Sequence, residues 1–246
     1  MKLRLLILCF LLTLYIPALA QKPEQPVISG KASDPELSVT THTITLGGEK
    51  ITYKATSGYL PQRDESGKIR ANIFFTAYTR DGVTNPATRP ITYTYNGGPG
   101  SASVWLHMGA LGPKRIQMGD DGRMLAPPYT VSDNEFTWLA FTDLVFIDPV
   151  MTGYSRPAEG IDKKEFTGYV EDIQSVGDFI RLYTTRYDRW SSPKFLSGES
   201  YGTTRSAGLS GYLQDRHGLF LNGIVLISSV LDFATLQFLI SGNELP

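Results

Sequence analysis

The stretch from Lys194 to Gly208 reads KFLSGESYGTTRSAG. Its short apolar segment, Phe195-Leu196, predicts a buried strand within Lys194 to Leu196, and Thr203 to Leu213 is compatible with a helix. Between the two lies the G-x-S-x-G pattern Gly198-Glu199-Ser200-Tyr201-Gly202. A chance match in a Gly- and Ser-rich loop is the alternative. The strand–turn–helix context instead favours a sharp turn that presents Ser200 for nucleophilic attack.

A second glycine-rich segment, Asn96-Gly97-Gly98-Pro99-Gly100, lies well upstream and follows a predicted strand over Pro90 to Tyr95. Such a loop leaves backbone N–H groups uncovered, and hydrolases use one to supply a second oxyanion donor. A phosphate-binding loop is disfavoured, because no Gly-Lys-Ser/Thr ending follows and Pro99 lacks an amide where a phosphate cradle needs one. A simple Gly/Pro turn remains the plainer alternative.

The front of the chain predicts an antiparallel meander. Three alternating, β-branched stretches are separated by turn signals such as Gly47-Gly48. These strands are expected at Val39 to Leu46, Lys50 to Thr56 and Arg70 to Thr79.

The pattern then changes to short apolar strands alternating with helices. Leu144 to Ile147 and Gly223 to Ile227 are continuous apolar runs, which are typical of buried parallel strands. Phe166 to Tyr187 has apolar residues at helical spacing. The chain therefore predicts an α/β fold: a mostly parallel sheet covered on both faces, with antiparallel N-terminal strands.

Three motifs together resemble the serine carboxypeptidase family in their residues, order and spacing. They are Asn96-Gly97-Gly98-Pro99-Gly100, Asp148 to Ser155 (DPVMTGYS) and Gly198-Glu199-Ser200-Tyr201-Gly202. The resemblance implies an α/β-hydrolase fold and a serine-type hydrolase that acts on peptide C-termini through an acyl-enzyme. It implies a peptide as the partner and no cofactor.

The resemblance also implies roles for individual residues. Ser200 would be the catalytic nucleophile, and the backbone amides of Gly98 and Tyr201 would form the oxyanion hole. Asn96, Gly97 and Glu199 would bind substrate. In the family, the positions of Asn96 and Glu199 hydrogen-bond the terminal carboxylate, which favours acidic pH because one of two facing carboxyl groups must hold a proton.

The sequence departs from the family pattern in three places. Ser101 stands where the family usually has a cysteine, and Ala110 stands where it often has a second glutamate. The Asp148 segment is one residue short, which predicts a displaced Tyr154 in the pocket wall. The missing glutamate leaves open an esterase or acyltransferase on the same scaffold. A non-catalytic binding module that kept the pocket is a separate alternative, which depends on whether a triad aspartate and histidine exist.

The histidines predict an incomplete catalytic triad. In this fold the chain order is Ser, then Asp, then His, so His42 and His107 come too early. His217 follows Ser200 on the same predicted helix, about 25 Å along its axis at 1.5 Å per residue, with Asp215 beside it. Asp232 comes too early for the family's aspartate. We therefore expect 37–246 to be the N-terminal part of a longer peptidase domain, inactive by itself and incomplete at its C-terminal side.

The N-terminus predicts export. Residues 1–20 combine a basic start, an apolar run and Ala18-Leu19-Ala20, as in a cleaved signal peptide, and 21–36 predict a flexible arm. The single cysteine, Cys9, lies in the signal, so no disulfide or thiol nucleophile is expected afterwards. A net charge of −1 without a basic patch predicts no nucleic-acid partner. We expect no metal site, no stable membrane association after cleavage, and a periplasmic or secreted location.

Overall fold

A computed structural model of the chain describes residues 35–230 and residue 232. The predicted signal peptide and nearly all of the predicted arm lie outside the described residues. Over the part of the chain that is described, no helix combines the length and the apolar character needed to cross a membrane.

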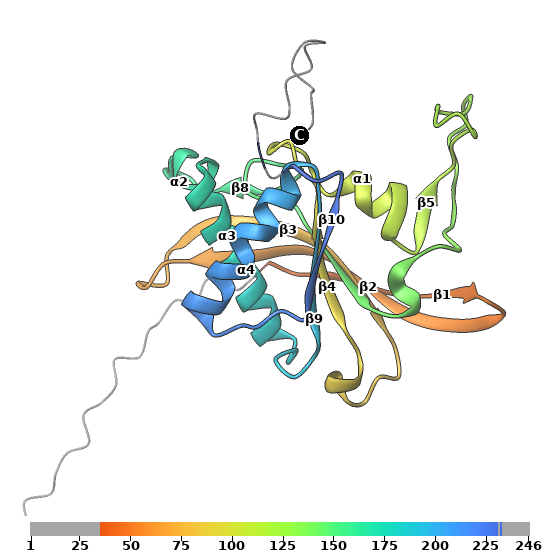
Figure 1. Cartoon of the computed structure of the whole chain (residues 1–246), viewed down its shortest axis with the longest axis horizontal. Helices are drawn as coiled ribbons and strands as arrows, with labels where there is room; N and C mark the ends of the chain where they lie inside the picture. Colours follow the sequence, from red (N-terminus) through yellow and green to blue (C-terminus); the bar gives the residue numbers. More distant parts are fainter. Residues whose placement is uncertain (1–34, 231, 233–246) are drawn as a thin grey trace, which may run out of the picture. The chain divides into compact units, whose positions relative to one another are not determined.

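One mixed sheet forms the centre of the molecule (Figure 1). Its strands run in the order β1-β2-β3-β7-β4-β9-β10, and the short β8 pairs with β3. The bounds are β1 Ser38–Leu46, β2 Glu49–Arg63, β3 Ile69–Arg80, β4 Ile91–Tyr95, β7 Asp143–Ile147, β8 Arg156–Pro157, β9 Lys194–Glu199 and β10 Gly223–Ile227.

The first three strands confirm the predicted antiparallel meander. β1 and β2 pair with Leu46 opposite Glu49, which leaves Gly47 and Gly48 as a two-residue turn with φ of +56° and +85°. A turn with φ above zero at both central residues matches the twist of a hairpin, and glycine adopts it without strain. β2 then continues to Arg63, well beyond the predicted strand, because it pairs with β3 along most of its length.

The other half of the sheet is parallel. β4 lies between β7 and β9, and β9 also pairs with β10. All residues of β4 and β7 are buried, which explains their continuous apolar sequences. Since parallel strands end at one edge of a sheet, this arrangement places the segments after β4, β7 and β9 together.

Two long helices pack together on one face of the sheet and cover the larger core (Figure 1). They are α3 (Tyr169–Arg186) and α4 (Tyr201–His217). The prediction of one helix over Phe166 to Tyr187 was wrong at its start, because a separate turn, α2 (Lys164–Thr167), precedes α3. Gly168 has an extended backbone (φ −81°, ψ 163°), which ends α2 and caps α3.

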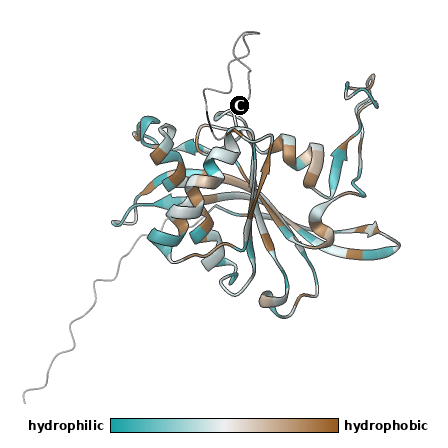
Figure 2. Cartoon of the chain, in the orientation of Figure 1, coloured by the Kyte–Doolittle hydropathy of each residue, from teal (hydrophilic) through white to brown (hydrophobic). Residues whose placement is uncertain are grey.

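The opposite face carries a smaller core beneath short elements. They are α1 (Val104–Leu106), the π-helical turn η2 (His107–Leu111), the hairpin strands β5 (Lys114–Ile116) and β6 (Val131–Asp133), and η3 (Trp138–Ala140). A further short turn, η1 (Pro86–Thr88), precedes β4. Leu106, Leu111 and Leu139 pack here against the first three strands and β7. The hydropathy colouring shows apolar residues at α1 and along β10 (Figure 2).

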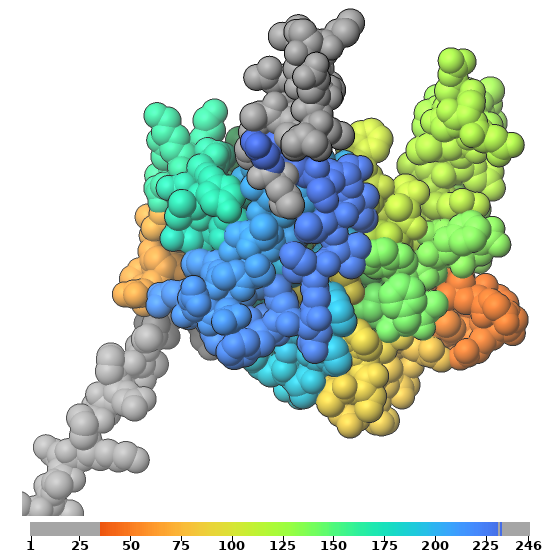
Figure 3. Space-filling view, viewed as in Figure 1, coloured from red at the N-terminus to blue at the C-terminus, as the bar shows by residue number. Residues whose placement is uncertain are grey.

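β10 forms as predicted, but the expectation that it is buried was wrong. Ile224 is 39% exposed and Val225 38% exposed. Among the described residues β9 is its only strand neighbour, so one edge of β10 is unpaired there. An apolar hollow of about 450 Å³ borders Val225, Phe195 and Trp138. In the space-filling view, α4 and β10 form the blue surface at the centre of the visible face (Figure 3).

Candidate active site

Ser200 occupies a strained turn between β9 and α4. Its backbone has φ 57° and ψ −124°, a conformation that L-residues rarely adopt. The turn is crowded, because a Cβ on Gly198 would lie 2.0 Å from the carbonyl oxygen of Gly202. The backbone amide of Ser200 donates to the carbonyl of Ile227 at 2.9 Å, which ties the turn to β10. This strand–turn–helix geometry matches the predicted nucleophile elbow.

The loop after β4 lies directly against this turn. β4 and β9 are in parallel register with Tyr95 beside Gly198, so both chains leave the sheet at the same level. A Cβ on Gly97 would lie 2.5 Å from the backbone nitrogen of Tyr201. Gly98 has φ +104°, a value that strains any residue with a side chain. The structure therefore brings the Gly97-Gly98 loop and the Tyr201 amide together.

Asn96 and Glu199 form a hydrogen-bonded pair at the same edge. The Nδ2 of Asn96 donates to the Oε2 of Glu199 at 3.0 Å. The Oδ1 of Asn96 accepts from the backbone amide of Leu106 at 3.0 Å, so the side chain is held from both ends, and it is 1% exposed. Glu199 is half-buried. All six predicted site residues thus lie in two adjacent segments, Asn96 to Gly98 and Glu199 to Tyr201.

A buried ion pair supports both segments from below. The fully buried Arg205 donates from Nε to Asp172 at 2.8 Å and from Nη1 to the carbonyl of Asn96 at 2.8 Å. Its guanidinium carbon lies 5.2 Å from the ring centroid of Tyr95 and 5.1 Å from that of Tyr201. Burial is the main cause that raises the pKa of Tyr201 to about 12, and the nearby Asp172 carboxylate adds to this shift. The Tyr201 hydroxyl is therefore neutral at physiological pH.

The sequence reasoning missed Arg205 and Asp172. A signal was present, because Tyr201, Arg205, Leu209 and Leu213 recur every four residues on the buried face of α4. A positive charge on a buried helical face needs a partner. The local sequence does not identify that partner, since Asp172 lies on another helix.

Each of the chain's three histidines is engaged away from Ser200. His42 is exposed on β1 and bonds Thr40 at 2.7 Å. His107 pairs with the hydroxyl of Tyr78 at 2.6 Å. His217 bonds Asp178 at 2.9 Å. Within the described residues, no group of three or more His, Cys, Asp or Glu side chains could hold a metal ion.

Asp148, from the third motif, joins the loop after β7 to the loop after β4. Its Oδ1 accepts from the amide of Ser103 at 2.9 Å, and its Oδ2 from the amide of Tyr154 at 3.4 Å. Burial raises the pKa of Asp148 above its ordinary value, although these amides act in the opposite direction. Tyr154 is 68% exposed and contacts Phe74 edge-on.

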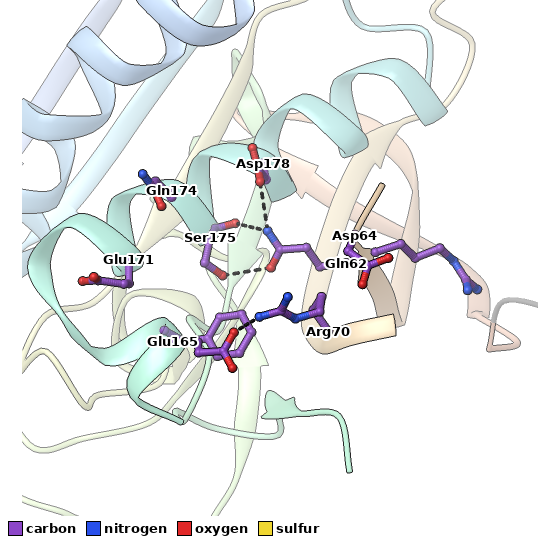
Figure 4. Close-up of a pocket in the computed structure, with 10 residues that line it drawn as sticks. Gln62, Asp64, Arg70, Glu165, Glu171, Gln174, Ser175 and Asp178 are labelled. Carbon is purple, nitrogen blue, oxygen red and sulfur yellow. Dashed lines mark hydrogen bonds and ion pairs between the residues drawn. The ribbon is translucent and has the colours of Figure 1, made fainter. Parts of the chain in front are cut away.

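Two cavities involve few or none of the predicted site residues. A small cavity of about 80 Å³ is lined by Pro99, Met151 and Tyr201. A more polar one, of about 280 Å³, lies between β2 and α3 (Figure 4). There Gln62 bonds Ser175 and Asp178, and Arg70 pairs with Glu165 (Figure 4). This pocket contains none of the predicted site residues.

The sheet order, the strained serine turn and the facing glycine loop define an α/β-hydrolase. Residues 47–232 match the family model for serine carboxypeptidases, and the chain belongs to this family. A solved structure of the prohormone-processing carboxypeptidase KEX1(delta)p from Saccharomyces cerevisiae superposes with a TM-score of 0.54 at 25% identity, covering 70% of this chain and 38% of that chain.

Curated relatives agree with this assignment. The pheromone-processing carboxypeptidase KEX1 of Saccharomyces cerevisiae (strain JAY291) is 33% identical over 156 residues, which are 59% of this chain and 20% of the yeast protein. Serine carboxypeptidase-like 35 of Arabidopsis thaliana is 26% identical over 239 residues, which are 93% of this chain and 47% of the plant protein. The chain thus spans less than half the length of these relatives.

Proposed function

We propose that this chain carries the nucleophile and oxyanion-binding part of a serine-type carboxypeptidase active site. The observation that supports this most directly is the packing of the Gly97-Gly98 loop against the amide of Tyr201, beside the strained turn at Ser200. Two backbone N–H groups beside a serine are what stabilisation of a tetrahedral intermediate requires.

The proposed chemistry runs through an acyl-enzyme. The Oγ of Ser200 attacks the scissile carbonyl carbon, and the carbonyl oxygen becomes an oxyanion that accepts from the amides of Gly98 and Tyr201. Collapse of the intermediate breaks the C–N bond and expels the C-terminal residue as an amine, which takes up the proton that Ser200 gave to the catalytic base. Water then attacks the ester on Ser200 and releases the shortened peptide.

The proton acceptor for Ser200 is the missing part of this arrangement. The three histidines of the chain contact Thr40, Tyr78 and Asp178 instead. We infer that the catalytic histidine and aspartate come from polypeptide beyond Pro246, and that the present chain by itself is inactive. A serine hydroxyl without its base is a poor nucleophile even when the oxyanion donors are in place.

The Asn96–Glu199 pair is the proposed binding site for the C-terminal carboxylate of the substrate. Asn96 is fixed by Leu106, so its amide presents a constant geometry to an incoming carboxylate. With Ala110 in place of a second glutamate, the end-binding site has one carboxyl group fewer. An esterase or acyltransferase on the same scaffold is therefore the second candidate, because acyl-enzyme chemistry is shared and the acceptor can differ.

We also propose that the protein is exported. Residues 1–20 have the sequence of a cleaved signal peptide, which would direct the mature protein to the periplasm or out of the cell. The mature protein would act on peptides, without nucleic-acid partners or stable membrane association. Mass spectrometry of the exported protein tests this, because cleavage at the predicted site gives an N-terminus at Gln21.

Labelling with a fluorophosphonate probe tests the nucleophile. We expect rapid labelling of Ser200 in the protein extended by its downstream coding sequence, and labelling slower by orders of magnitude in the present chain. Ser200→Ala should abolish labelling, whereas Ser210→Ala, on the same helix, should not. Rapid labelling of the present chain would contradict the inferred missing base. No labelling of the extended protein would contradict the hydrolase and favour a binding module.

Substrate choice separates the two catalytic candidates. Peptides with a free C-terminal carboxylate and the same peptides amidated at the C-terminus should be compared in the extended protein. A requirement for the free carboxylate supports the carboxypeptidase. Equal cleavage of both, or faster turnover of simple esters, supports the alternative.

A further inference from the structure

A separate pocket of about 460 Å³ lies between β3, the end of β7 and the start of α1. Its lining includes Phe74, Phe146, Tyr154, His107 and Asp148. None of the six proposed site residues lines it, so it lies beside the catalytic arrangement and not within it. Its volume is in the range of pockets that hold small organic ligands.

One buried carboxylate faces this otherwise apolar and aromatic space. Asp148 is 8% exposed, and each of its oxygens accepts one backbone N–H, from Ser103 and from Tyr154. An ionised carboxylate has about four acceptor positions, so about two remain unused. Among the described side chains, no cation forms an ion pair with Asp148. The nearby Arg156 donates instead to the carbonyls of Thr152, Gly153 and Ser155.

Among the residues that the structure describes, no lysine or arginine lines the pocket. His107 stacks on Phe146 with ring centroids 4.4 Å apart and bonds the hydroxyl of Tyr78. Burial lowers the pKa of His107 to about 4, so its ring is neutral at pH 7. Phe74 and Tyr154 meet edge-on at 5.1 Å on another wall. The pocket therefore combines aromatic rings with one buried carboxylate that has no ion-pair partner among the described side chains, although the charge of Arg156 acts on it from nearby.

We propose that this pocket binds the primary ammonium group of an aliphatic amine, as found in a lysine side chain or a free alkylamine. The ammonium would pair with the carboxylate of Asp148, and the alkyl stem would lie against the rings of Phe74, Phe146 and Tyr154. Aromatic faces attract organic cations, and a buried carboxylate is stabilised by a paired cation. A metal ion is a poorer occupant, because one carboxylate among apolar walls offers too few ligands.

Binding of n-pentylammonium, 1-pentanol and pentanoate to the present chain, followed by amide NMR shifts, tests this site. The first two probes are nearly the same size and differ in charge. We expect n-pentylammonium to bind about tenfold or more tightly than 1-pentanol, with shifts at Thr76, Ser103 and Gly153. Pentanoate should not bind. Equal affinity for the amine and the alcohol, or shifts elsewhere, would overturn the proposal.

Two variants assign the effect to the pocket. Asp148→Asn should reduce n-pentylammonium affinity to that of 1-pentanol, whereas Asp133→Asn, at an exposed carboxylate, should leave it unchanged. Tyr154→Ser changes an exposed side chain and keeps Asp148. This substitution should weaken binding of the amine severalfold and binding of the alcohol by less. It replaces Asp148→Asn as the test of the site if Asp148→Asn fails to fold. Unchanged amine affinity in a folded Asp148→Asn protein would refute the site, as would unchanged affinity in Tyr154→Ser if only that variant folds. Binding of L-lysine and of an N-acetylated lysyl peptide should then be compared. Tighter binding of the peptide indicates a lysine side chain of a polypeptide as the ligand, and tighter binding of L-lysine indicates a free amine.

Discussion

The buried guanidinium of Arg205 donates a hydrogen bond of 2.8 Å to the backbone carbonyl of Asn96. Arg205 thereby links the helix after the Ser200 turn to the loop after β4 that carries Gly98. Asp172 neutralises its charge from α3. The contacts of Arg205 are therefore structural, since it holds the Asn96 carbonyl and the Asp172 carboxylate together.

Removal of this guanidinium should destabilise the protein strongly. Arg205→Met leaves the Asp172 carboxylate buried without its cation, so we expect the free energy of unfolding to fall by about 3–5 kcal/mol. Urea denaturation measures this. Arg216→Met, at an exposed position on the same helix, should change stability by less than about 0.5 kcal/mol. Similar effects of the two substitutions would show that the buried pair is unimportant.

The glycine before Ser200 should not tolerate a methyl group. A Cβ at Gly198 would lie 2.0 Å from the carbonyl of Gly202 and 2.7 Å from the Oγ of Ser206. Gly198→Ala should therefore lower the free energy of unfolding by about 1–3 kcal/mol or prevent folding. Gly211→Ala has nothing within 4 Å and lies in α4, so it should stabilise by about 0.5–1 kcal/mol. If both substitutions changed the free energy of unfolding in the same direction, the crowded turn described at Gly198 would be contradicted.

His107 should make stability fall in acid. Burial lowers its pKa to about 4 in the folded protein, below about 6.5 in the unfolded chain. The unfolded state therefore takes up the proton first as the pH falls. The full contribution is present above pH 6.5 and is lost progressively towards pH 4, by about 3 kcal/mol.

Denaturation at several pH values, with NMR titration of the His107 ring, measures this effect. His107→Gln keeps a hydrogen-bonding side chain but does not titrate in this range. Its unfolding free energy should depend less on pH between 6.5 and 4 than that of the unmodified protein. Parallel curves for the two proteins would assign the acid sensitivity to other groups.

A second buried charge cluster lies at the other end of the parallel strands. Asp143 pairs with Arg89 at 3.0 Å and with Arg189 at 2.6 Å. Asp143→Asn should lower the free energy of unfolding by about 3–5 kcal/mol, because two guanidiniums lose their counter-charge. Asp133→Asn, in the exposed pair with Lys114, should cost less than about 1 kcal/mol. Comparable losses in urea denaturation would count against a structural role for the cluster.

Local sequence features predicted most of the fold elements. The strand before Ser200, the helix after it and the antiparallel N-terminal strands are all present, since alternation, β-branching and glycine placement act over a few residues. Boundaries were less accurate. The helix predicted from Phe166 is interrupted at Gly168, and β9 extends to Glu199. β10 was expected to be buried, but burial depends on neighbouring elements and not on a strand's own apolar residues.

The sequence by itself determined the two glycine-rich turns, because crowding and positive φ at Gly98 and Ser200 are properties of short segments. Only the tertiary structure decided which side chains meet: Asn96 with Glu199, Arg205 with Asp172, and the histidines with partners away from Ser200. The parallel register of β4 and β9 produces the first of these pairs. Contacts between residues distant in sequence depend on strand order and helix packing, which no local pattern specifies.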